Sequence, residues 1–372
     1  MMQSEVFSDT DKMYMRRCIQ LAMNGLGTCT PNPMVGAVIV RNAKIIGEGW
    51  HRKAGSSHAE PIAINSVKNQ NWLKESTLYV SLEPCSHYGK TPPCVDLIIK
   101  KQIPRVVIGC LDVFPLVSGS GVRKLKAAGI EVVVGPEMKA CLELNKRFFT
   151  FHAQKRPYIL LKWAQTSDGF IDYSREPDTK TSPLSISTPL TRIITHKLRS
   201  EYDVILVGTK TALLDNPKLN VRDWFGKNPV RAVLDRQLIL NPDLNLFDEN
   251  GKTLVFTESK GINSKNLKHI ELSFEKDFPA NVLDALYVEG YQSLLVEGGS
   301  KLHNSFIKAG LWDELHIEVS PQIIGSGVPS PELDGIKFHS KSSHSYGEAK
   351  DLRKIKILRS SYMVNSLTFG GE

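Results

Sequence analysis

The sequence predicts an α/β protein with two domains. Short apolar runs alternate with amphipathic, helix-like segments through both halves of the chain, a pattern typical of sheets covered by helices. The length of 372 residues fits two domains better than one. All six cysteines precede residue 150, and the polar, basic segment 150–157 follows them. The boundary is therefore expected there, giving domains 1–152 and 153–372.

The first half opens with a predicted helix over 9–24, which has an aspartate as its cap and Gly25 as its stop. A proline-rich turn at 30–33 follows it. Apolar runs bounded by turn residues then predict strands at 35–40, 44–50, 77–82, 105–110 and 131–134. Helical patterns are predicted at 58–68, 95–101 and 121–128. This alternation favours a three-layer α/β domain.

The second half shows the same alternation. Strands are predicted at 158–163, 204–208, 232–234, 254–257, 293–296 and 315–319. Helices are predicted at 189–199 and 300–309. The polar segments 172–186 and 326–348 are expected to be loops, and 352–358 and 363–368 are expected to form edge strands or loop.

The composition excludes several classes of protein. Apolar residues make up 41% and charged residues 23% of the chain, which is enough to bury sizeable cores and excludes wholesale disorder. No run of about 18 apolar residues occurs, so no transmembrane helix and no membrane partner are expected. The polar, acidic N-terminal segment lacks the order of a secretion signal, so we expect a cytoplasmic protein with reduced cysteines.

The net charge of +8 has two interpretations. It can reflect a solvated surface with a basic bias, or it can attract anions such as phosphorylated metabolites and nucleotides. The basic residues are scattered, with one short cluster at 100–105, so nucleic acid is not expected as a partner. A small-molecule partner and a homo-oligomeric state are expected.

Three short segments of the first half supply the ligand set of a hydrolytic zinc site, namely 58–60 (H-A-E), 83–85 (E-P-C) and 92–94 (P-P-C). Such a site needs three protein ligands and an open position for water, and His58, Cys85 and Cys94 supply one imidazole and two thiolates. Zinc lowers the pKa of bound water to about 7. Glu60 can then move the water's proton to a leaving amine. The order matches the H-x-E and P-C-x-x-C pattern of zinc-dependent nucleobase deaminases.

Each of these pieces alone has a simpler interpretation. A histidine and a nearby glutamate often form a surface pair, and cysteines are more often small buried apolar residues than ligands. Their joint order, after a predicted strand and beside prolines, favours the zinc site. His51 and His87 have two equally good interpretations. Each can lie near the metal or contact the substrate, or each can lie in a solvated loop. The remaining cysteines have no partner at ligand spacing and are expected in the core: Cys18, Cys29, Cys110 and Cys141.

The same motifs resemble a known family. Residues 30–36 (T-P-N-P-M-V-G), 58–60 (H-A-E) and 82–94 (L-E-P-C-S-H-Y-G-K-T-P-P-C) resemble the deaminase domain of the bifunctional riboflavin-biosynthesis deaminase/reductase, which has a cytidine-deaminase-like three-layer fold. General zinc deaminases leave two residues between their cysteines, whereas the segment 86–93 separates them here. The resemblance implies hydrolysis of an exocyclic amine from a pyrimidine that carries a phosphoribosylamino group.

The resemblance also implies substrate contacts at Asn32, His51 and Lys90. Lys90 is a candidate in its own right, because a cation on a glycine-containing loop can reach a phosphate. The alternative is an ordinary exposed lysine. The family carries an Asn-Pro-x-Val-x-Gly-x-Gly stretch further on, in which Phe114 replaces the asparagine here.

The second half has two features typical of a ligand site, although it lacks the glycine pattern of a Rossmann domain. A predicted strand runs through Glu297 and a Gly-Gly pair into a helix, whose first backbone N–H groups can hold a phosphate. Most such junctions are only tight turns. The polar segment 214–222 carries Asp215 and Arg222, and its Asn-Pro pair is equally typical of a turn.

The second half resembles the reductase domain of the same family, which has a dihydrofolate-reductase-like fold and uses NADPH. The resemblance rests on Lys162 and on 167–169, 198–199, 207–211, 215–222 and 296–299. By position it implies cofactor contacts at Ala164, Thr211, Asp215, Gly299, Ser300, Lys301, Leu302, His303, Asn304 and Ser305. It implies substrate contacts at Arg199, Leu219, Arg222 and Glu297, and the two arginines suit a bidentate grip on a phosphate.

Lys162 and Asp215 are the candidates for the chemistry of reduction. Hydride transfer to an aldehyde-like sugar carbon places negative charge on its oxygen, so a proton source or electrophile is needed nearby. Either side chain can protonate or position the opened sugar. The family's Trp-Ile-Thr before the first reductase helix reads S-I-S at 185–187 here, after a longer loop, which removes an aromatic surface near the expected cofactor.

The leading hypothesis is a bifunctional enzyme of riboflavin biosynthesis. It combines zinc-dependent deamination of 2,5-diamino-6-(5-phosphoribosylamino)pyrimidin-4(3H)-one with NADPH-dependent reduction of 5-amino-6-(5-phosphoribosylamino)uracil to the ribityl form. One alternative is a zinc-dependent nucleic-acid editing deaminase with an accessory binding domain. The cysteine spacing and the lack of a patch rich in arginine and aromatic residues disfavour it. A catalytically silent regulator is disfavoured by the intact His58, Glu60, Cys85 and Cys94.

Overall fold

The structure, a computed structural model, describes residues 7–88, 92–112, 119–176, 181–275, 277–336, 338–345 and 353–359. The chain divides between Lys155 and Arg156 into two compact units. This division lies beyond residue 152, where the sequence predicts the boundary, because helix α6 (Lys146–Gln154) continues past that residue. Within the described ranges, no helix is both long and apolar enough to cross a membrane.

The first unit is built on a five-stranded mixed sheet in the order β2-β1-β3-β4-β5. Its strands are β1 (Gly36–Arg41), β2 (Lys44–Trp50), β3 (Thr77–Leu82), β4 (Arg105–Cys110) and β5 (Glu131–Val134). Strand β1 runs antiparallel to β2 and β3, whereas β3, β4 and β5 are parallel. Its helices are α1 (Asp9–Met23), α2 (Ala59–Ser66), η1 (Gln70–Glu75), α3 (Cys94–Lys100), α4 (Ser120–Ala127), α5 (Met138–Leu144) and α6.

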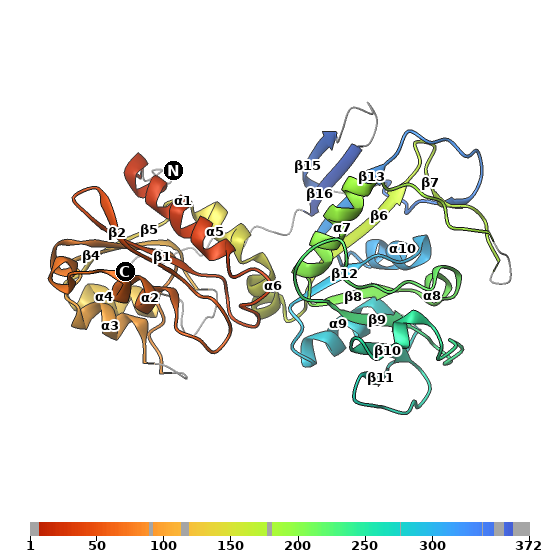
Figure 1. The fold of residues 1–372 in the computed structure, drawn as a ribbon, viewed down its shortest axis with the longest axis horizontal. Coiled ribbons are helices and arrows are strands. Elements are labelled where there is room, and N and C mark those ends of the chain that lie inside the picture. Colours follow the sequence, from red (N-terminus) through yellow and green to blue (C-terminus); the bar gives the residue numbers. More distant parts are fainter. Residues whose placement is uncertain are drawn as a thin grey trace. The chain divides into compact units, whose positions relative to one another are not determined.

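Helices cover both faces of this sheet, with α1 and α5 above it and α2, α3 and α4 below it in Figure 1. The layers follow from the two-residue alternation of side chains along a strand. In β1, Val38 packs in one core with Met15 of α1, and Ile39 packs in the other core with Ala63 of α2. The predicted three-layer α/β domain is confirmed.

The second unit is built on a nine-stranded sheet in the order β11-β10-β9-β8-β12-β6-β13-β16-β15. The parallel strands are β6 (Tyr158–Gln165), β8 (Val204–Val207), β9 (Val230–Leu234), β10 (Thr253–Thr257), β11 (Leu267–Glu271), β12 (Ser293–Val296) and β13 (Glu314–Val319). The antiparallel edge is formed by β15 (Phe338–Ser345) and β16 (Arg353–Arg359). A separate pair is formed by β7 (Phe170–Asp172) and β14 (Val328–Pro329).

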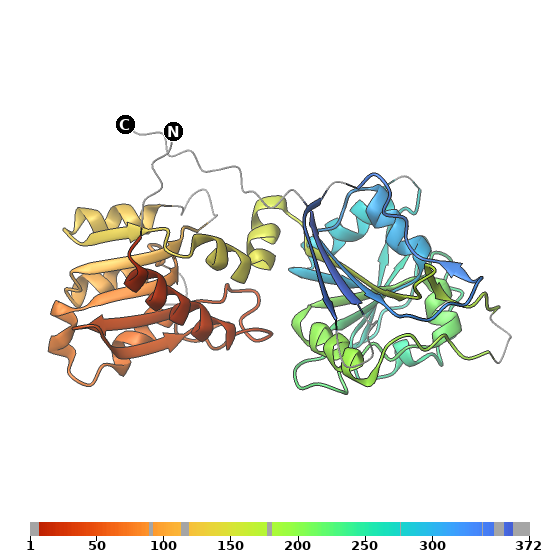
Figure 2. The ribbon, with the colours of Figure 1, turned by 90° about the horizontal axis from the view of Figure 1, so that it is seen from above.

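Helices pack on both faces of this sheet too (Figure 2). Its helices are α7 (Pro189–Glu201), α8 (Thr209–Asp215), η2 (Asn245–Phe247), α9 (Phe278–Val288) and α10 (Ser300–Lys308). Along β6, Leu161 packs in the core with Leu283 of α9 and Phe306 of α10. Leu160 packs in the opposite core with Ala212 of α8. The predicted fold class of two α/β domains is therefore confirmed.

The structure corrects several element predictions. The segment 326–348 is predicted to be a loop, but it contains β14 and the edge strand β15, whose side chains at 340–343 are exposed and polar and so give no apolar alternation. The sequence analysis predicts no element over 138–154, where α5 and α6 lie. These are two short helices joined at Asn145, whose side-chain amide makes hydrogen bonds of 2.8 and 2.9 Å with the backbone of Met34. Of the two tail segments, 353–359 is a strand and 363–368 lies outside the described residues.

Candidate active sites

Three side chains of the first unit converge as a metal ligand set. Nδ1 of His58 lies 3.6 Å from Sγ of Cys85 and 3.3 Å from Sγ of Cys94, and the ligand atoms of all three lie within 4.8 Å of one another. In the described part of the chain, this is the one such cluster of histidine, cysteine and acidic side chains. One imidazole and two thiolates are a donor set of catalytic zinc sites. The residues present therefore fit zinc.

The ligands come from the ends of three elements. His58 is the N-cap of α2, Cys94 is the first residue of α3, and Cys85 lies in the turn after β3. The backbone N–H of Cys94 donates a hydrogen bond to Sγ of Cys85 at 3.3 Å. Hydrogen bonds from Cys94 and His58 stabilise the thiolate and lower the pKa of Cys85 well below its usual range. A thiolate is the form that binds metal.

Glu83 fixes the turn that carries Cys85. Its buried carboxylate accepts four backbone hydrogen bonds, from the N–H groups of Gly121 (2.9 Å), Val122 (3.3 Å), Gly119 (2.9 Å) and Asp112 (3.2 Å). A Cβ atom at Gly121 would lie 2.4 Å from the carbonyl oxygen of Pro84, so the close approach of α4 to this turn requires glycine. Glu83 belongs to the predicted E-P-C motif, but nothing in the sequence indicates these partners.

Glu60 is the second residue of α2, beside the ligand set. It is only 3% exposed. Burial and, to a smaller extent, the negative charge of Cys85 raise the pKa of Glu60 to about 7. A carboxyl group with such a pKa can both accept and release a proton at neutral pH. The predicted catalytic residue and the three predicted ligands are thus brought together.

His51 and Asn32 form a pair next to this cluster. The ring of His51 is 5.6 Å from that of His58 between centroids. Nδ1 of His51 donates to the carbonyl oxygen of Ser57 at 3.0 Å, which leaves Nε2 to accept from the amide nitrogen of Asn32 at 3.1 Å. Burial lowers the pKa of His51, consistent with this neutral form.

The other candidates near this site lie apart or outside the described residues. His87 is exposed on its loop. Lys90 and Phe114 lie outside the described residues, so their predicted roles stay predictions. The four cysteines expected in the core, Cys18, Cys29, Cys110 and Cys141, are buried free thiols, as predicted.

The second unit holds a cavity of about 780 Å³ at the carboxyl ends of β6, β8, β9 and β12. Ligands of open α/β sheets bind at this end of the strands. Lys162, Asp215 and Glu297, all singled out in the sequence, line the cavity. So do most of the positions implied as cofactor contacts, namely Ala164, Thr211, Gly299, Ser300, Lys301, Leu302, His303 and Ser305. Ser185, Ile186 and Ser187 also line it, where the family has Trp-Ile-Thr.

Two glycines let the strand ends approach closely at this cavity. A Cβ atom on Gly298 would lie 2.7 Å from Cα of Val207, the last residue of β8. Gly299 has φ +31° and is the N-cap of α10, and a Cβ atom there would be 3.3 Å from the hydroxyl oxygen of Thr211. The Gly-Gly pair thus shapes the wall where α10 begins.

His303 is the strongest sign that this cavity holds a ligand. It is 1% exposed, its ring lies 5.2 Å from that of Trp163, and neither ring nitrogen has a hydrogen-bond partner within the described residues. Burial lowers its pKa to about 3, so the ring is neutral and offers one donor and one acceptor. Buried polar atoms nearly always have a hydrogen-bond partner. We therefore expect a molecule bound in this cavity to supply partners for the ring nitrogens of His303.

Arg199, Arg222 and Glu297 form a polar cluster, of which only Glu297 lines the cavity. The guanidinium of Arg199 donates to both carboxylate oxygens of Glu297, at 3.0 and 2.6 Å, and to the carbonyl oxygen of Asn220 at 3.2 Å. Arg222 donates to the side-chain oxygen of Asn220 at 3.3 Å, and about half of its side chain is exposed. Glu297 itself lines the cavity, so the predicted substrate contacts lie beside the predicted cofactor contacts.

Besides Arg199 and Arg222, two further predicted contacts, Asn304 and Leu219, do not line this cavity. The side-chain oxygen of Asn304 accepts a hydrogen bond of 2.9 Å from the backbone N–H of Glu332. Leu219 is 2% exposed in the core beneath the sheet, with φ +48°. The side chain of Leu219 is packed in the core, so a substrate could contact this residue only through its backbone.

Arg175 is a cavity residue that the sequence analysis misses. It follows β7 in the segment 172–186, predicted to be a loop, and its guanidinium contacts the carboxylates of Asp172 and Asp215. A lone arginine in a polar loop gives no sequence signal, because its partner Asp215 lies far along the chain.

Comparison with known proteins decides the family. A family model described as "RibD C-terminal domain" matches residues 157–352. A second family model, described as "Cytidine and deoxycytidylate deaminase zinc-binding region", matches residues 8–110. The riboflavin biosynthesis protein RibD of Aquifex aeolicus is 39% identical over 351 residues, covering 91% of this chain and 97% of that protein. RibD of Bacillus amyloliquefaciens is 38% identical over 340 residues, covering 89% and 90%. The chain belongs to the RibD family.

Solved structures of the RibD family have the same fold. The diaminohydroxyphosphoribosylaminopyrimidine deaminase/5-amino-6-(5-phosphoribosylamino)uracil reductase of Thermotoga maritima aligns with a TM-score of 0.82 at 36% identity, covering 94% of this chain and 99% of that one. RibD of Acinetobacter baumannii aligns with a TM-score of 0.81 at 30% identity, covering 94% and 98%.

The chain is thus a bifunctional RibD enzyme of riboflavin biosynthesis, with a zinc-binding deaminase domain and a reductase domain. The family resemblance noted in the sequence is confirmed. The nucleic-acid editing alternative is not favoured, because both matched domains occur in the order of RibD.

Proposed function

We propose that the first unit hydrolyses the 2-amino group of 2,5-diamino-6-(5-phosphoribosylamino)pyrimidin-4(3H)-one. We propose further that the second unit reduces 5-amino-6-(5-phosphoribosylamino)uracil to its ribityl form with NADPH. The observation that carries the first step is the convergence of His58, Cys85 and Cys94 beside the buried Glu60. The observation that carries the second is the cavity with an unpartnered, buried His303 among the described residues.

In the deaminase, we assign His58, Cys85 and Cys94 as the residues that hold zinc. When bound, zinc would supply a Lewis acid that activates water for attack. Glu60 takes a proton from the water and delivers it to the departing amine, a task that suits a carboxyl with a pKa of about 7. Asn32, oriented by its hydrogen bond to His51, contacts the pyrimidine.

In the reductase, we assign Lys162 as the proton source and Arg199 and Arg222 as the phosphate contacts. Burial raises the pKa of Glu297, but the charge and hydrogen bonds of Arg199 outweigh it and lower that pKa, and the charge of Lys162 adds a smaller lowering. Lys162 therefore lies close to Glu297. The cofactor would supply the hydride, and the ammonium group of Lys162 gives a proton to the oxygen on which charge develops. His303 offers a donor and an acceptor to the bound molecules.

The cavity wall supports a phosphorylated cofactor. Arg192, Lys210 and Lys301 line it with exposed side chains, and cations suit the extra phosphate that distinguishes NADPH from NADH. The homo-oligomeric state and the cytoplasmic location remain predictions of the sequence.

The two proposed half-reactions can be tested separately on one purified preparation. The deaminase is expected to lose activity when a chelator removes zinc and to recover it when zinc is restored, while the reductase is unaffected. The reductase is expected to oxidise NADPH faster than NADH with the deaminated substrate. Equal rates with the two nucleotides would contradict the proposed cofactor, and chelator-resistant deamination would contradict the metal site.

A further inference from the structure

Arg175 is the most buried of the arginines and lysines that line the reductase cavity in the described part of the chain. Its side chain is only 3% exposed, although it carries a full positive charge. A buried guanidinium needs anionic partners to offset its desolvation. It has two, since its Nε donates to a carboxylate oxygen of Asp172 at 2.8 Å and its Nη2 donates to Oδ1 of Asp215 at 2.5 Å.

We propose that Arg175 is a positioning residue of the reductase, which fixes the side chain of Asp215 as a hydrogen-bond acceptor on the cavity wall. The proposal rests on the proposed function, in which Asp215 contacts the nucleotide cofactor. Arg175 also donates to the carbonyl oxygen of Leu214 at 3.3 Å, so it grips the end of α8 at two points. The first contact orients the carboxylate of Asp215 and the second holds the backbone carbonyl of Leu214, so the guanidinium restricts the end of α8 more than a single ion pair does.

Arg175 is itself held from the other side. Asp172, its first partner, accepts with Oδ1 a hydrogen bond of 2.9 Å from the backbone N–H of Leu184. Leu184 lines the same cavity. The ion pair therefore connects the segment after β7, the cavity wall at Leu184 and the C-terminal end of α8.

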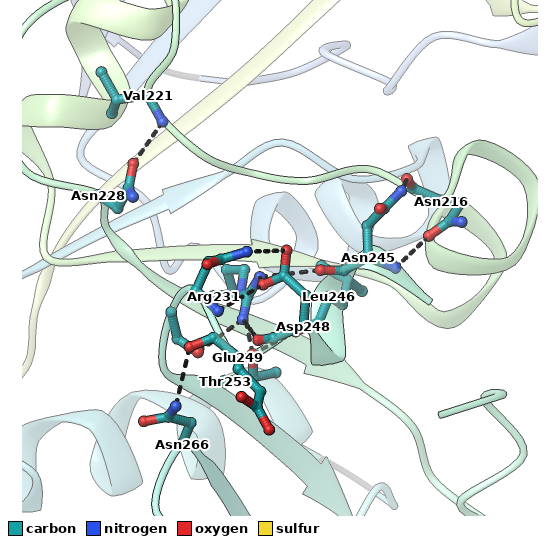
Figure 3. A network of polar contacts seen from close by, with 12 residues as sticks. Asn216, Val221, Asn228, Arg231, Asn245, Leu246, Asp248, Glu249, Thr253 and Asn266 are labelled. Atoms are coloured by element: carbon teal, nitrogen blue, oxygen red, sulfur yellow. Dashed lines mark hydrogen bonds and ion pairs between the residues drawn. The ribbon is translucent and has the colours of Figure 1, made fainter. Parts of the chain in front are cut away.

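The residue after Asp215 is anchored as well. The side-chain oxygen of Asn216 accepts from the backbone N–H of Asn245, and its carbonyl oxygen accepts from the Asn245 side chain, both at 2.7 Å (Figure 3). The carbonyl oxygen of Asn245 in turn accepts from the buried Arg231 at 3.0 Å (Figure 3). The backbone at Asp215 is thus held by one network and its carboxylate by another.

This arrangement assigns different roles to the two candidate groups of the reductase. Oδ1 of Asp215 is occupied by Arg175, whereas Oδ2 has no hydrogen-bond partner in the described part of the chain, and about a third of the side chain is exposed. A carboxylate oxygen is a hydrogen-bond acceptor, so Oδ2 is placed to accept from ligand hydroxyl or amide groups. Asp215 then positions the cofactor, and proton delivery is left to Lys162.

The test is a double-substitution cycle on NADPH binding by the full-length, zinc-loaded protein. Binding is followed by energy transfer from tryptophan to the bound nucleotide, since Trp163 lines the cavity. The proteins are wild type, Arg175→Gln, Arg175→Lys, Asp215→Ala and the double variant Arg175→Gln with Asp215→Ala. Lys268→Ala, which removes a surface ion pair with Glu289, is the control for loss of a cation elsewhere. Thermal melting shows which variants are folded.

We expect Arg175→Gln to raise the dissociation constant of NADPH about tenfold, the size of effect that coupled charged contacts commonly show. Arg175→Lys should recover much of the affinity, and the double variant should bind no more weakly than Asp215→Ala alone. A merely structural role for Arg175 would instead give multiplied losses in the double variant. If Arg175→Gln is unfolded, the test rests on Arg175→Lys. An affinity of Arg175→Lys for NADPH as low as that of Asp215→Ala would then overturn the proposal.

Failure of this inference can be told from failure of the proposed function. Wild-type binding of NADPH with unchanged affinity in Arg175→Gln would refute the role of Arg175 alone. A wild-type protein that does not bind NADPH would refute the proposed cofactor and, with it, this role.

Discussion

Replacing Glu83 by glutamine should destabilise the deaminase unit without touching a metal ligand. Each carboxylate oxygen of Glu83 accepts two backbone N–H groups, Oε1 from Gly121 and Val122, and Oε2 from Asp112 and Gly119. The amide of glutamine has one acceptor oxygen. Its NH2 group would therefore face two N–H donors that lose their partner, one on a buried glycine and one on a half-buried residue.

The size of the effect follows from these two donors. A buried, unsatisfied polar group costs roughly 1–3 kcal/mol, and a half-buried donor can bond to water instead, so Glu83→Gln should lower the free energy of unfolding by about 1–3 kcal/mol. For a unit of this size, each kcal/mol corresponds to about 2–4 °C in the melting temperature. Zinc affinity should fall too, because Glu83 fixes the turn that carries Cys85.

Calorimetry and zinc analysis of the full chain measure both effects. Glu75→Gln is the matched control, because Glu75 makes a surface ion pair with Arg41 and its side chain is 65% exposed. Such pairs contribute about 0–1 kcal/mol. The assigned role of Glu83 would be refuted if the Glu83→Gln protein had the same melting temperature as the Glu75→Gln protein and retained full zinc.

Three further predictions concern the active sites. Cys94→Ser should strip the metal and abolish deamination, and full zinc occupancy in that variant would overturn the ligand assignment. Glu60→Gln should lower the deamination rate by about 10²–10⁴-fold, the usual contribution of a general acid/base, while zinc content stays unchanged. Arg222→Ala should weaken substrate binding in the reductase by about 1.5–3 kcal/mol and leave deamination intact. Loss of deamination with intact reduction in the Arg222 variant would contradict the proposed division of labour.

The deaminase site could be predicted well from the sequence because its ligands lie in short, ordered motifs at element ends. His58 and Glu60 share one helix start, and the prolines beside Cys85 and Cys94 mark the turns that present them. The four backbone partners of Glu83 could not be predicted, because a pairing between a side chain and distant N–H groups leaves no pattern in the residue types.

The reductase site was harder to predict because distant segments meet in it. Positions implied by family resemblance line the cavity in most cases. The exceptions are Arg199 and Arg222, which lie next to the lining residue Glu297 or to Asn220; Asn304, which bonds to Glu332; and Leu219, which packs in the core. Arg175 was missed because its role depends on Asp215, which only the tertiary fold brings near. The polar edge strand β15 was predicted as a loop for a related reason, since only its pairing with β16 makes it a strand.

The most direct test of the whole account is mass analysis of products from the diaminopyrimidine phosphate, incubated with the zinc-loaded chain with and without NADPH. Without NADPH, we expect exchange of one amino group for oxygen and no further change. With NADPH, the same product should gain two hydrogens. A substrate that is reduced without deamination, or left unchanged in both incubations, would contradict the account.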